Sequence, residues 1–282
     1  MEQHEKQLLS DEIRKLADKT SQNKVAARAG VSPATISAIL NKSWKMVSDE
    51  MWRKIQSSLK IDLNWRHAET KNFRTLQFQL KAAQSQSLSI AVAYFEGRSK
   101  SHSYKYFERH NDNVIYVECK NYWTKKTYVQ ALMRAAGFSN LDGTVPELVE
   151  IFIDHVRALS KPMIIIDQAD KLKDPQLDLF MDLFNDLESC CAFVQSGTPA
   201  LRERIKRGVN KDRVGYREWF SRIGRKFITL DETSEEDTKL VCQVNGIDDE
   251  NTILDIHVVS EGDMRRIRRE IEKYWLINGK AA

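Results

Sequence analysis

The segment MIIIDQADKL places a carboxylate directly after a short apolar run. Asp167 ends this run, whose isoleucines are typical of a strand buried on both faces of a parallel sheet. At the carboxyl edge of such a sheet, a carboxylate can reach Mg²⁺ bound beside a phosphate. The next residue, Gln168, can hold a water molecule but cannot take its proton, and Asp170 is a weaker substitute two residues further on. A strand that simply ends in a capping aspartate is the alternative.

A second segment, YFEGRSKS, follows the first apolar run of the chain and could hold phosphate. In the pattern G-x-x-x-x-G-K-S/T, backbone N–H groups surround the phosphates, the lysine reaches them and the hydroxyl reaches Mg²⁺. Lys100 and Ser101 fit the last two positions, and Gly97 adds a residue that tolerates unusual backbone angles. Tyr94 and Ser99 stand where the pattern has glycine. The segment is either a phosphate loop of unusual composition or a solvated basic loop.

Further polar residues could complete a phosphate site. Thr198 ends another apolar run and could contact a phosphate or water, or only cap the next helix. Residues 202–226 hold ten basic and three acidic side chains, which favours phosphate contacts over an ordinary solvated face. Within them, Arg222 or Arg225 could reach the nucleotide of a neighbouring subunit. Arg265 could fold back onto a phosphate from the start of a later helix, or lie on a basic helix face.

The spacing of apolar residues within 9–62 predicts short helices, two of which are joined by a turn at Gly30. This arrangement is the signature of a helix-turn-helix, whose second helix enters the major groove of DNA. Ser32 is the expected N-cap of that helix, with Pro33 at its first position. The residues expected at base edges or phosphates are Ser32, Ala34, Thr35, Ser37, Asn41, Lys42 and Lys45. A helical module that docks another protein is the alternative.

A second candidate DNA-facing segment is CKNYWTKKTYV. Basic side chains flank two aromatic ones there, a combination found on nucleic-acid surfaces. The lysines are Lys120, Lys125 and Lys126, and the aromatic residues are Tyr122 and Trp123. The two rings could equally pack under the adjoining helix.

The composition excludes several classes of protein. The chain has 282 residues, of which 41% are hydrophobic and 30% charged, as in ordinary foldable domains. Its net charge of +4 is too small to indicate a nucleic-acid partner by itself. Four cysteines without a C-x-x-C pair argue against a disulfide framework or zinc site. The charged start and the lack of a long apolar run argue against a signal peptide and a membrane span, so we expect a cytoplasmic protein.

Strand-like and helix-like segments alternate after residue 87, which predicts a three-layer α/β domain with a parallel sheet. The expected strands lie at 88–95, 113–119, 163–167, 192–198 and 225–230. The expected helices between them lie at 101–110, 125–137, 146–159, 175–188 and 199–207. We expect a helix-turn-helix domain at 1–65, a linker helix at 66–86, the α/β domain at 87–232 and a helical subdomain at 233–282.

Together these segments resemble the phage Mu B transposition protein family. The members of this family are AAA+ ATPases that activate target DNA. The resemblance covers nearly the whole chain and rests on the order and spacing of its motifs. Those motifs are VAARAGVSPATISAILN, SIAVAYF, YKYFERHNDNVIYV, IIIDQADKL and WFSRIGRK. The resemblance implies an AAA+ domain with a C-terminal helical lid, preceded by an all-α helix-turn-helix domain.

The resemblance also implies ATP and Mg²⁺ as cofactors and assigns roles by position. The cofactor-binding residues would be Gly97, Ser99, Lys100, Ser101 and Arg265, with Arg265 as sensor 2. The catalytic group would be Asp167 as the Walker B residue, Gln168 after it, Thr198 as sensor 1 and Arg222 as the arginine finger. Ser101 and Asp167 would hold Mg²⁺.

The implied partners are double-stranded DNA, a transposase and further copies of the chain. The family assembles with ATP into helical filaments on duplex DNA without strong sequence preference, selects target DNA and stimulates the transposase, so we expect this chain to form a helical filament or ring. This chain departs from the family at Tyr94, Ser99 and Gln168. Two other functions therefore stay open: an ATP-independent DNA-binding scaffold, and a helix-turn-helix transcriptional repressor.

Overall fold

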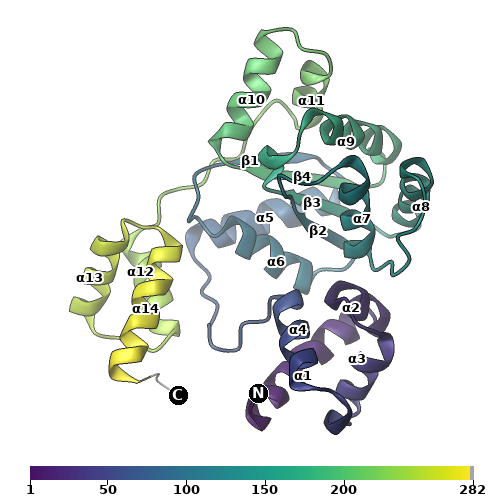
Figure 1. Ribbon diagram of the computed structural model, residues 1–282. Coiled ribbons are helices and arrows are strands. Elements are labelled where there is room, and N and C mark those ends of the chain that lie inside the picture. Colours follow the sequence, from purple (N-terminus) through teal and green to yellow (C-terminus); the bar gives the residue numbers. More distant parts are fainter. Residues whose placement is uncertain (280–282) are drawn as a thin grey trace.

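The computed structural model describes residues 1–279, and it begins with a bundle of short helices (Figure 1). The bundle has its own core, in which Trp52 and Ile36 are fully buried. Gly30 ends the second helix at a φ of 65°, and the Ser32 hydroxyl caps the third by accepting the Thr35 N–H at 3.2 Å. The helices are α1 (Gln3–Lys19), α2 (Gln22–Ala29), α3 (Pro33–Leu40) and α4 (Asp49–Leu59), with a 3₁₀ turn at Trp44–Met46.

A parallel sheet of four strands, in the order β1-β4-β3-β2, forms the centre of the next domain. All four carboxyl ends therefore lie along one edge, where Glu118 pairs in register with Asp167 and Ala93 with Gly197. The α/β prediction is confirmed. The strands are β1 (Ile90–Ala93), β2 (Val114–Glu118), β3 (Met163–Asp167) and β4 (Ala192–Gly197).

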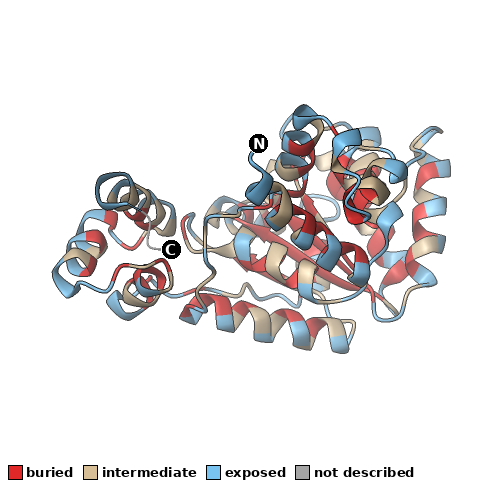
Figure 2. Ribbon diagram, turned by 90° about the horizontal axis from the view of Figure 1, so that it is seen from below, coloured by how far each residue is buried: buried red, intermediate tan, exposed pale blue. Residues whose placement is uncertain are grey.

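Helices cover both faces of the sheet, and Figure 2 shows the buried strands between them. Successive residues of a strand point to opposite faces, so Ile164 and Ile166 join one apolar cluster while Met163 and Ile165 join the other. This explains why the strands are apolar without alternation. Helices α5 (Lys71–Ser85) and α6 (Lys100–His110) cover one face. The other face is covered by α7 (Lys125–Ala136), α8 (Val145–Arg157), α9 (Asp174–Leu187), α10 (Pro199–Asn210) and α11 (Tyr216–Arg222).

The prediction of a fifth strand at 225–230 is wrong, because the structure has only a single bridging residue within this segment. Ile228 pairs with Val92, and its N–H donates to the Ala91 carbonyl at 2.8 Å. The start of the segment is turned, because Gly224 and Arg225 both have positive φ angles. Such angles are incompatible with an extended strand. The short helix α11 just before it was not predicted.

Three further helices form a separate bundle near the C-terminus, with a core that includes Val241 and Ile267. Trp65, from the segment that leads into α5, packs against this core. The helices are α12 (Glu235–Val244), α13 (Glu250–Ser260) and α14 (Met264–Asn278). No helix within residues 1–279 is long and apolar enough to cross a membrane.

The N-terminal bundle contacts the α/β domain through charged side chains. Arg28 of α2 forms a 2.8 Å ion pair with buried Glu108 of α6. The Arg109 guanidinium donates to the carbonyls of Leu59 and Lys60 at the end of α4. These contacts place α4 beside α6, as Figure 1 shows.

Candidate functional site

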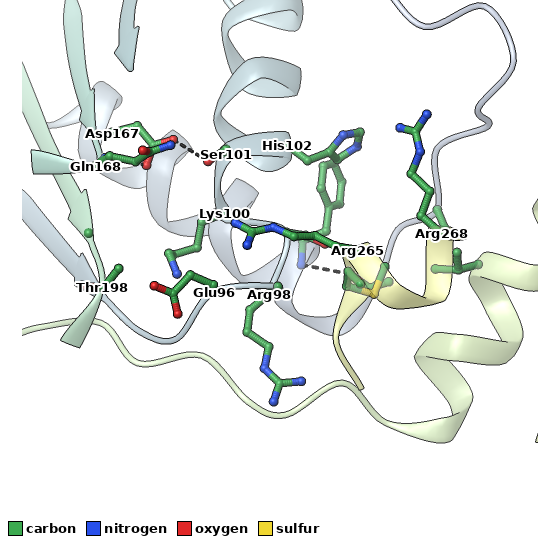
Figure 3. Close-up of a pocket in the computed structure, with 18 of the residues that line it drawn as sticks. Glu96, Arg98, Lys100, Ser101, His102, Asp167, Gln168, Thr198, Arg265 and Arg268 are labelled. Atoms are coloured by element: carbon green, nitrogen blue, oxygen red, sulfur yellow. Dashed lines mark hydrogen bonds between the residues drawn. The ribbon is translucent and has the colours of Figure 1, made fainter. Parts of the chain in front are cut away.

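A cavity of 490 Å³ opens at the carboxyl edge of the sheet, between the α/β domain and α14. Its size lies within the range of sites for small ligands. It brings together residues that are far apart in sequence, among them Lys100, Asp167, Thr198 and Arg265 (Figure 3). Gly97, Ser99, Ser101, Gln168 and Asp170 line the same cavity.

The loop between β1 and α6 forms one wall of the cavity. Ser99, the residue just before α6, has a φ of 58°, in the left-handed region that favours glycine. A serine in this conformation costs about 1 kcal/mol. The first amides of α6 lack partners within the helix and carry its positive dipole end, which suits an anion. The loop therefore leads into a helix start whose free amides suit an anion, at the position where Ser99 replaces glycine.

The two replaced glycines are not equivalent. Tyr94 has no positive φ, and its N–H continues the pairing of β1 by donating to the Gly197 carbonyl at 3.3 Å. Glycine is therefore not needed at position 94 for backbone reasons. Gly97 has a φ of 73°, and a Cβ on it would lie 2.3 Å from a carboxylate oxygen of Asp263. The loop keeps glycine at position 97, where the Asp263 side chain leaves no room for a Cβ.

Lys100 is the first residue of α6, and its ammonium group is bound to main-chain oxygens of the preceding loop. Its Nζ donates to the carbonyls of Tyr94 and Phe95, each at 2.6 Å. Burial lowers the pKa of Lys100, while the negative charges of Asp167 and Glu96 oppose that shift. A phosphate in the cavity would offer this lysine a charged acceptor in place of two neutral ones.

Ser101 and Asp167 meet in the cavity. The Ser101 hydroxyl donates to Oδ2 of Asp167 at 2.5 Å, and Asp167 is only 1% exposed (Figure 3). Asp167 also accepts the Tyr116 hydroxyl at 3.0 Å and the Gln168 N–H at 2.9 Å. Within residues 1–279, no three His, Cys, Asp or Glu side chains are grouped to hold a metal. One hydroxyl and one carboxylate nevertheless fit Mg²⁺, which takes few protein ligands and keeps water and substrate phosphate oxygens.

Gln168 is held at both ends of its amide. Its Nε2 donates to Oε1 of Glu118 at 3.1 Å, and its Oε1 accepts from Lys171. Its φ of 56° is another left-handed conformation outside glycine, a kind of strain that concentrates at functional sites. Sequence reasoning missed Glu118, although it ends the strand beside the one that carries Asp167.

Glu118 is surrounded by lysines. Lys60 of the N-terminal bundle approaches Oε2 at 2.6 Å, with Lys120 at 3.2 Å from Oε1 and Lys105 at 3.6 Å from Oε2. Burial by itself would raise the pKa of Glu118. The hydrogen bond from Lys60 and the charges of Lys105 and Lys60 outweigh burial and lower the pKa to about 2.

Thr198 and Asp170 join two neighbouring strand ends. The Thr198 N–H donates to Oδ1 of Asp170 at 3.1 Å, and its hydroxyl accepts the Ala200 N–H at 3.3 Å, which caps α10. A Cβ on Gly197 would lie 2.4 Å from Oδ1 of Asp170. The absence of a side chain at Gly197 therefore gives the Asp170 carboxylate its place.

Helix α14 is tied to the phosphate-loop side of the cavity. The Met264 N–H donates to the Gly97 carbonyl at 2.9 Å, and Arg98 donates to the Gly262 carbonyl at 2.6 Å and to the Thr233 hydroxyl at 3.1 Å. Arg265 extends from the first turn of α14 toward Lys100 (Figure 3). A ligand in the cavity would thus contact both the α/β domain and the C-terminal helices.

The far wall of the cavity consists of aromatic and imidazole groups that the motif search did not find. Trp65, His67, Phe73 and His102 line it. Nδ1 of His67 and Nε2 of His102 share a hydrogen bond at 2.8 Å. Burial lowers the pKa of His102 to about 4, with a smaller contribution from His67. Arg268 also lines the cavity and lies over the Trp65 ring, 5.0 Å from its centroid, so this wall offers rings beside one positive charge, which suits a planar heterocycle.

Arg222 does not reach this cavity. It lies in α11, where its guanidinium bonds Glu188 at 2.8 Å, Asn185 at 2.9 Å and Glu218 at 3.1 Å, and stacks over the Phe184 ring. Other basic residues of 202–226 are also neutralised, since Arg204 and Arg213 both pair with Asp174. The role expected of Arg222 concerns a neighbouring subunit, so it stays a prediction.

The residues expected at DNA lie on two separate surfaces. Ser32 caps the start of α3, Thr35 and Ser37 lie within it, and Asn41 and Lys42 follow its end; the helix lies on the side of the bundle away from the sheet (Figure 1). In this set the Ser32 and Thr35 hydroxyls are 2.9 Å apart, and Asn41 Nδ2 donates to Ser37 Oγ at 3.3 Å.

The second surface lies at the start of α7. Lys125 and Lys126 begin the helix, and Lys126 is exposed, while Lys120 is engaged by Glu118. Tyr122 is 79% exposed, whereas Trp123 packs against the core. One ring of the pair is therefore available to a ligand and the other is structural.

Comparison with known families gives two matches, one in the N-terminal bundle and one in the α/β domain. Residues 83–205 match the AAA domain family, and residues 12–66 match the helix-turn-helix family. No curated protein matches the chain. The two matches support an AAA+-type protein with a helix-turn-helix domain that binds DNA. They do not name the Mu B family, so that finer assignment remains a proposal.

Proposed function

We propose that the protein is an ATP-dependent DNA-binding protein of DNA transposition. In this function the cavity binds ATP with Mg²⁺, α3 contacts duplex DNA, and several copies assemble on the duplex to select it as a target and activate a transposase. Mg²⁺ would neutralise charge on the phosphates from its place at Ser101 and Asp167.

The observation that carries the nucleotide part is the meeting of three groups at the start of α6. Lys100 follows a left-handed Ser99, and the Ser101 hydroxyl lies 2.5 Å from Asp167, the last residue of β3. Such a lysine, hydroxyl and carboxylate at a helix N-terminus are the parts of a phosphate-loop nucleotide site. Arg265 on α14 supplies a further positive charge in the same cavity.

The DNA and transposition parts rest on different support. The helix-turn-helix match supports DNA binding, and so does the position of α3 on the side of the bundle away from the sheet. The order of motifs, shared with the Mu B family, supports the role in transposition and the assembly of several copies. The same two domains also suit a repressor, which would bind one DNA sequence rather than coat a duplex.

Binding of fluorescent ATP to the purified chain, with Mg²⁺ and with or without duplex DNA, tests the nucleotide part. We expect saturable binding that Lys100→Ala weakens about tenfold to a hundredfold, the loss of one charged hydrogen-bond donor. Lys81→Ala is the matched control, because Lys81 is exposed on α5 and does not line the cavity. Equal binding by all three proteins, or none by the parent chain, would contradict the proposal.

Electron microscopy of the chain on a linear duplex of arbitrary sequence tests the assembly. Continuous coating that requires ATP is the expected result. Coating without any nucleotide would favour the ATP-independent scaffold. Occupancy confined to one short sequence would favour the repressor.

A further inference from the structure

We propose that Asp170 is the proton acceptor for ATP hydrolysis in this cavity, in place of the carboxylate that position 168 lacks. The proposal rests on the proposed nucleotide binding. A water molecule that attacks the terminal phosphate must lose a proton, and an amide such as Gln168 cannot accept it. The carboxylate must come from another residue that lines the cavity.

Three carboxylates line the cavity: Glu96, Asp167 and Asp170. Asp167 already accepts three hydrogen bonds and is the one placed to hold Mg²⁺ with Ser101. Glu96 belongs to the phosphate loop and lies beside Lys100 (Figure 3). Asp170 follows the end of β3 and bonds the Thr198 N–H at the end of β4.

One carboxylate oxygen of Asp170 has a hydrogen-bond partner in the described part of the chain, and the other does not. Oδ1 accepts the Thr198 N–H at 3.1 Å, and Oδ2 has no hydrogen-bond partner among residues 1–279. No cation within these residues forms an ion pair with it, in contrast to Glu118 and Asp174. The carboxylate is thus oriented by a main-chain group, and its second oxygen is available to a water molecule.

The surroundings of Gln168 suit an amide, because its Oε1 accepts from Lys171 while its Nε2 has an acceptor to reach. Its Nε2 donates to the carboxylate of Glu118 at 3.1 Å. A glutamate there would place a second carboxylate against Glu118, and two such charges repel at this distance. Glu118 cannot serve as the base itself, because it does not line the cavity and three lysines hold its negative charge.

The proposed step balances as an in-line hydrolysis. The water oxygen forms a bond to the terminal phosphorus, and the bond from that phosphorus to the bridging oxygen of ADP breaks. The proton of the water passes to Asp170 Oδ2, which later returns it to solvent. The products are ADP and inorganic phosphate, and no oxidant or reductant takes part.

Asp170→Asn tests the assignment, because the asparagine Oδ1 can still accept the Thr198 N–H. We expect release of phosphate from ATP with Mg²⁺ and duplex DNA to fall about 100-fold or more, since a general base contributes roughly 10² to 10⁴. The affinity for fluorescent ATP and the melting temperature should stay within error of the parent values. Asp182→Asn, an exposed change on α9, is the matched control.

The possible outcomes separate this proposal from the proposed function. Undiminished hydrolysis by Asp170→Asn would overturn it, and so would a parent chain that binds ATP without hydrolysing it; both leave nucleotide binding intact. A parent chain that does not bind ATP would remove the proposed function itself.

An exchange of two residues gives a second test in the Asp170→Asn background. Gln168→Glu combined with Glu118→Gln restores a carboxylate at position 168 and keeps an amide opposite it. We expect the combined exchange to recover hydrolysis and Gln168→Glu alone to recover much less. Full recovery by Gln168→Glu alone would show that Glu118 does not exclude a carboxylate there and would overturn that part of the argument.

Discussion

The N-terminal bundle and the cavity are built on different principles. In the bundle, the signals lie close together in sequence: Gly30 ends one helix and Ser32 caps the next. In the cavity, the groups that meet come from distant segments, as Ser101 meets Asp167 and Gly97 meets Asp263. The bundle therefore follows its motif closely, whereas the cavity departs from its motif and compensates through contacts that no short pattern records.

The largest expected effect is a loss of stability that is confined to the N-terminal bundle. Trp52 is fully buried and packs edge to face on Trp44, so Trp52→Ala should cost about 3–5 kcal/mol of stability in the bundle. Denaturant unfolding should then show the bundle melting first, with loss of DNA binding and retained ATP binding. Met46→Ala, at an 81% exposed residue, is the control. A single transition that also abolishes ATP binding would show that the regions do not behave independently.

A smaller effect probes the contact between the phosphate loop and α14. In Gly97→Ala, strain at positive φ adds to a clash with Asp263, and together they should cost about 2–3 kcal/mol and weaken ATP binding. Gly224→Ala isolates the strain, because Gly224 has a φ of 72° and nothing within 4 Å of its Cβ position. Calorimetry of both variants gives the difference. Equal destabilisation would mean that the loop and α14 adjust freely to each other.

The next prediction concerns pH and Glu118. The folded pKa is about 2 against an ordinary value of 4.5, so its stabilisation is complete above pH 4.5 and is lost as the pH falls toward 2. Glu118→Gln should cost about 2 kcal/mol at pH 6, the value of a charged hydrogen bond. Urea unfolding of both proteins from pH 6 to pH 3 should show this difference shrinking as acid is added. A constant difference would mean that the charge of Glu118 is not what stabilises the fold.

The smallest effect distinguishes the two replaced glycines. Ser99→Gly should relieve left-handed strain and raise stability by up to about 1 kcal/mol, without loss of ATP affinity. Tyr94→Gly should lower stability by about 1 kcal/mol, because Tyr94 has ordinary strand geometry and packs against the core. Thermal unfolding of the pair provides the measurement. The comparison fails if both variants shift the melting temperature in the same direction.

These contrasts show how much of the molecule could be predicted from its sequence. Four strands, the helices between them and the cap of α3 follow from local patterns, and all are present. The segment 225–230 misled the prediction because an apolar run does not reveal the positive φ angles just before it. Motif spacing predicted Lys100, Ser101 and Asp167 as site residues, and all three line the cavity.

Other parts of the site could not be found in this way. The interaction of Glu118 with Gln168 depends on which strands are neighbours, and the place of Asp170 depends on the lack of a side chain at Gly197. Trp65 and His67 reach the cavity from a segment without any recognisable motif. Such features arise from the tertiary arrangement and become visible only when the distant segments are placed together.

The ion pairs between the N-terminal bundle and the α/β domain have a mechanical consequence. Tension on a duplex held by α3 would be carried first by the Arg28–Glu108 pair and by the bonds from Arg109 to the end of α4. The Lys60–Glu118 pair would pass part of that load to the tip of β2, one hydrogen bond from Gln168. A pull on the bundle would therefore reach the wall of the cavity through these bonds.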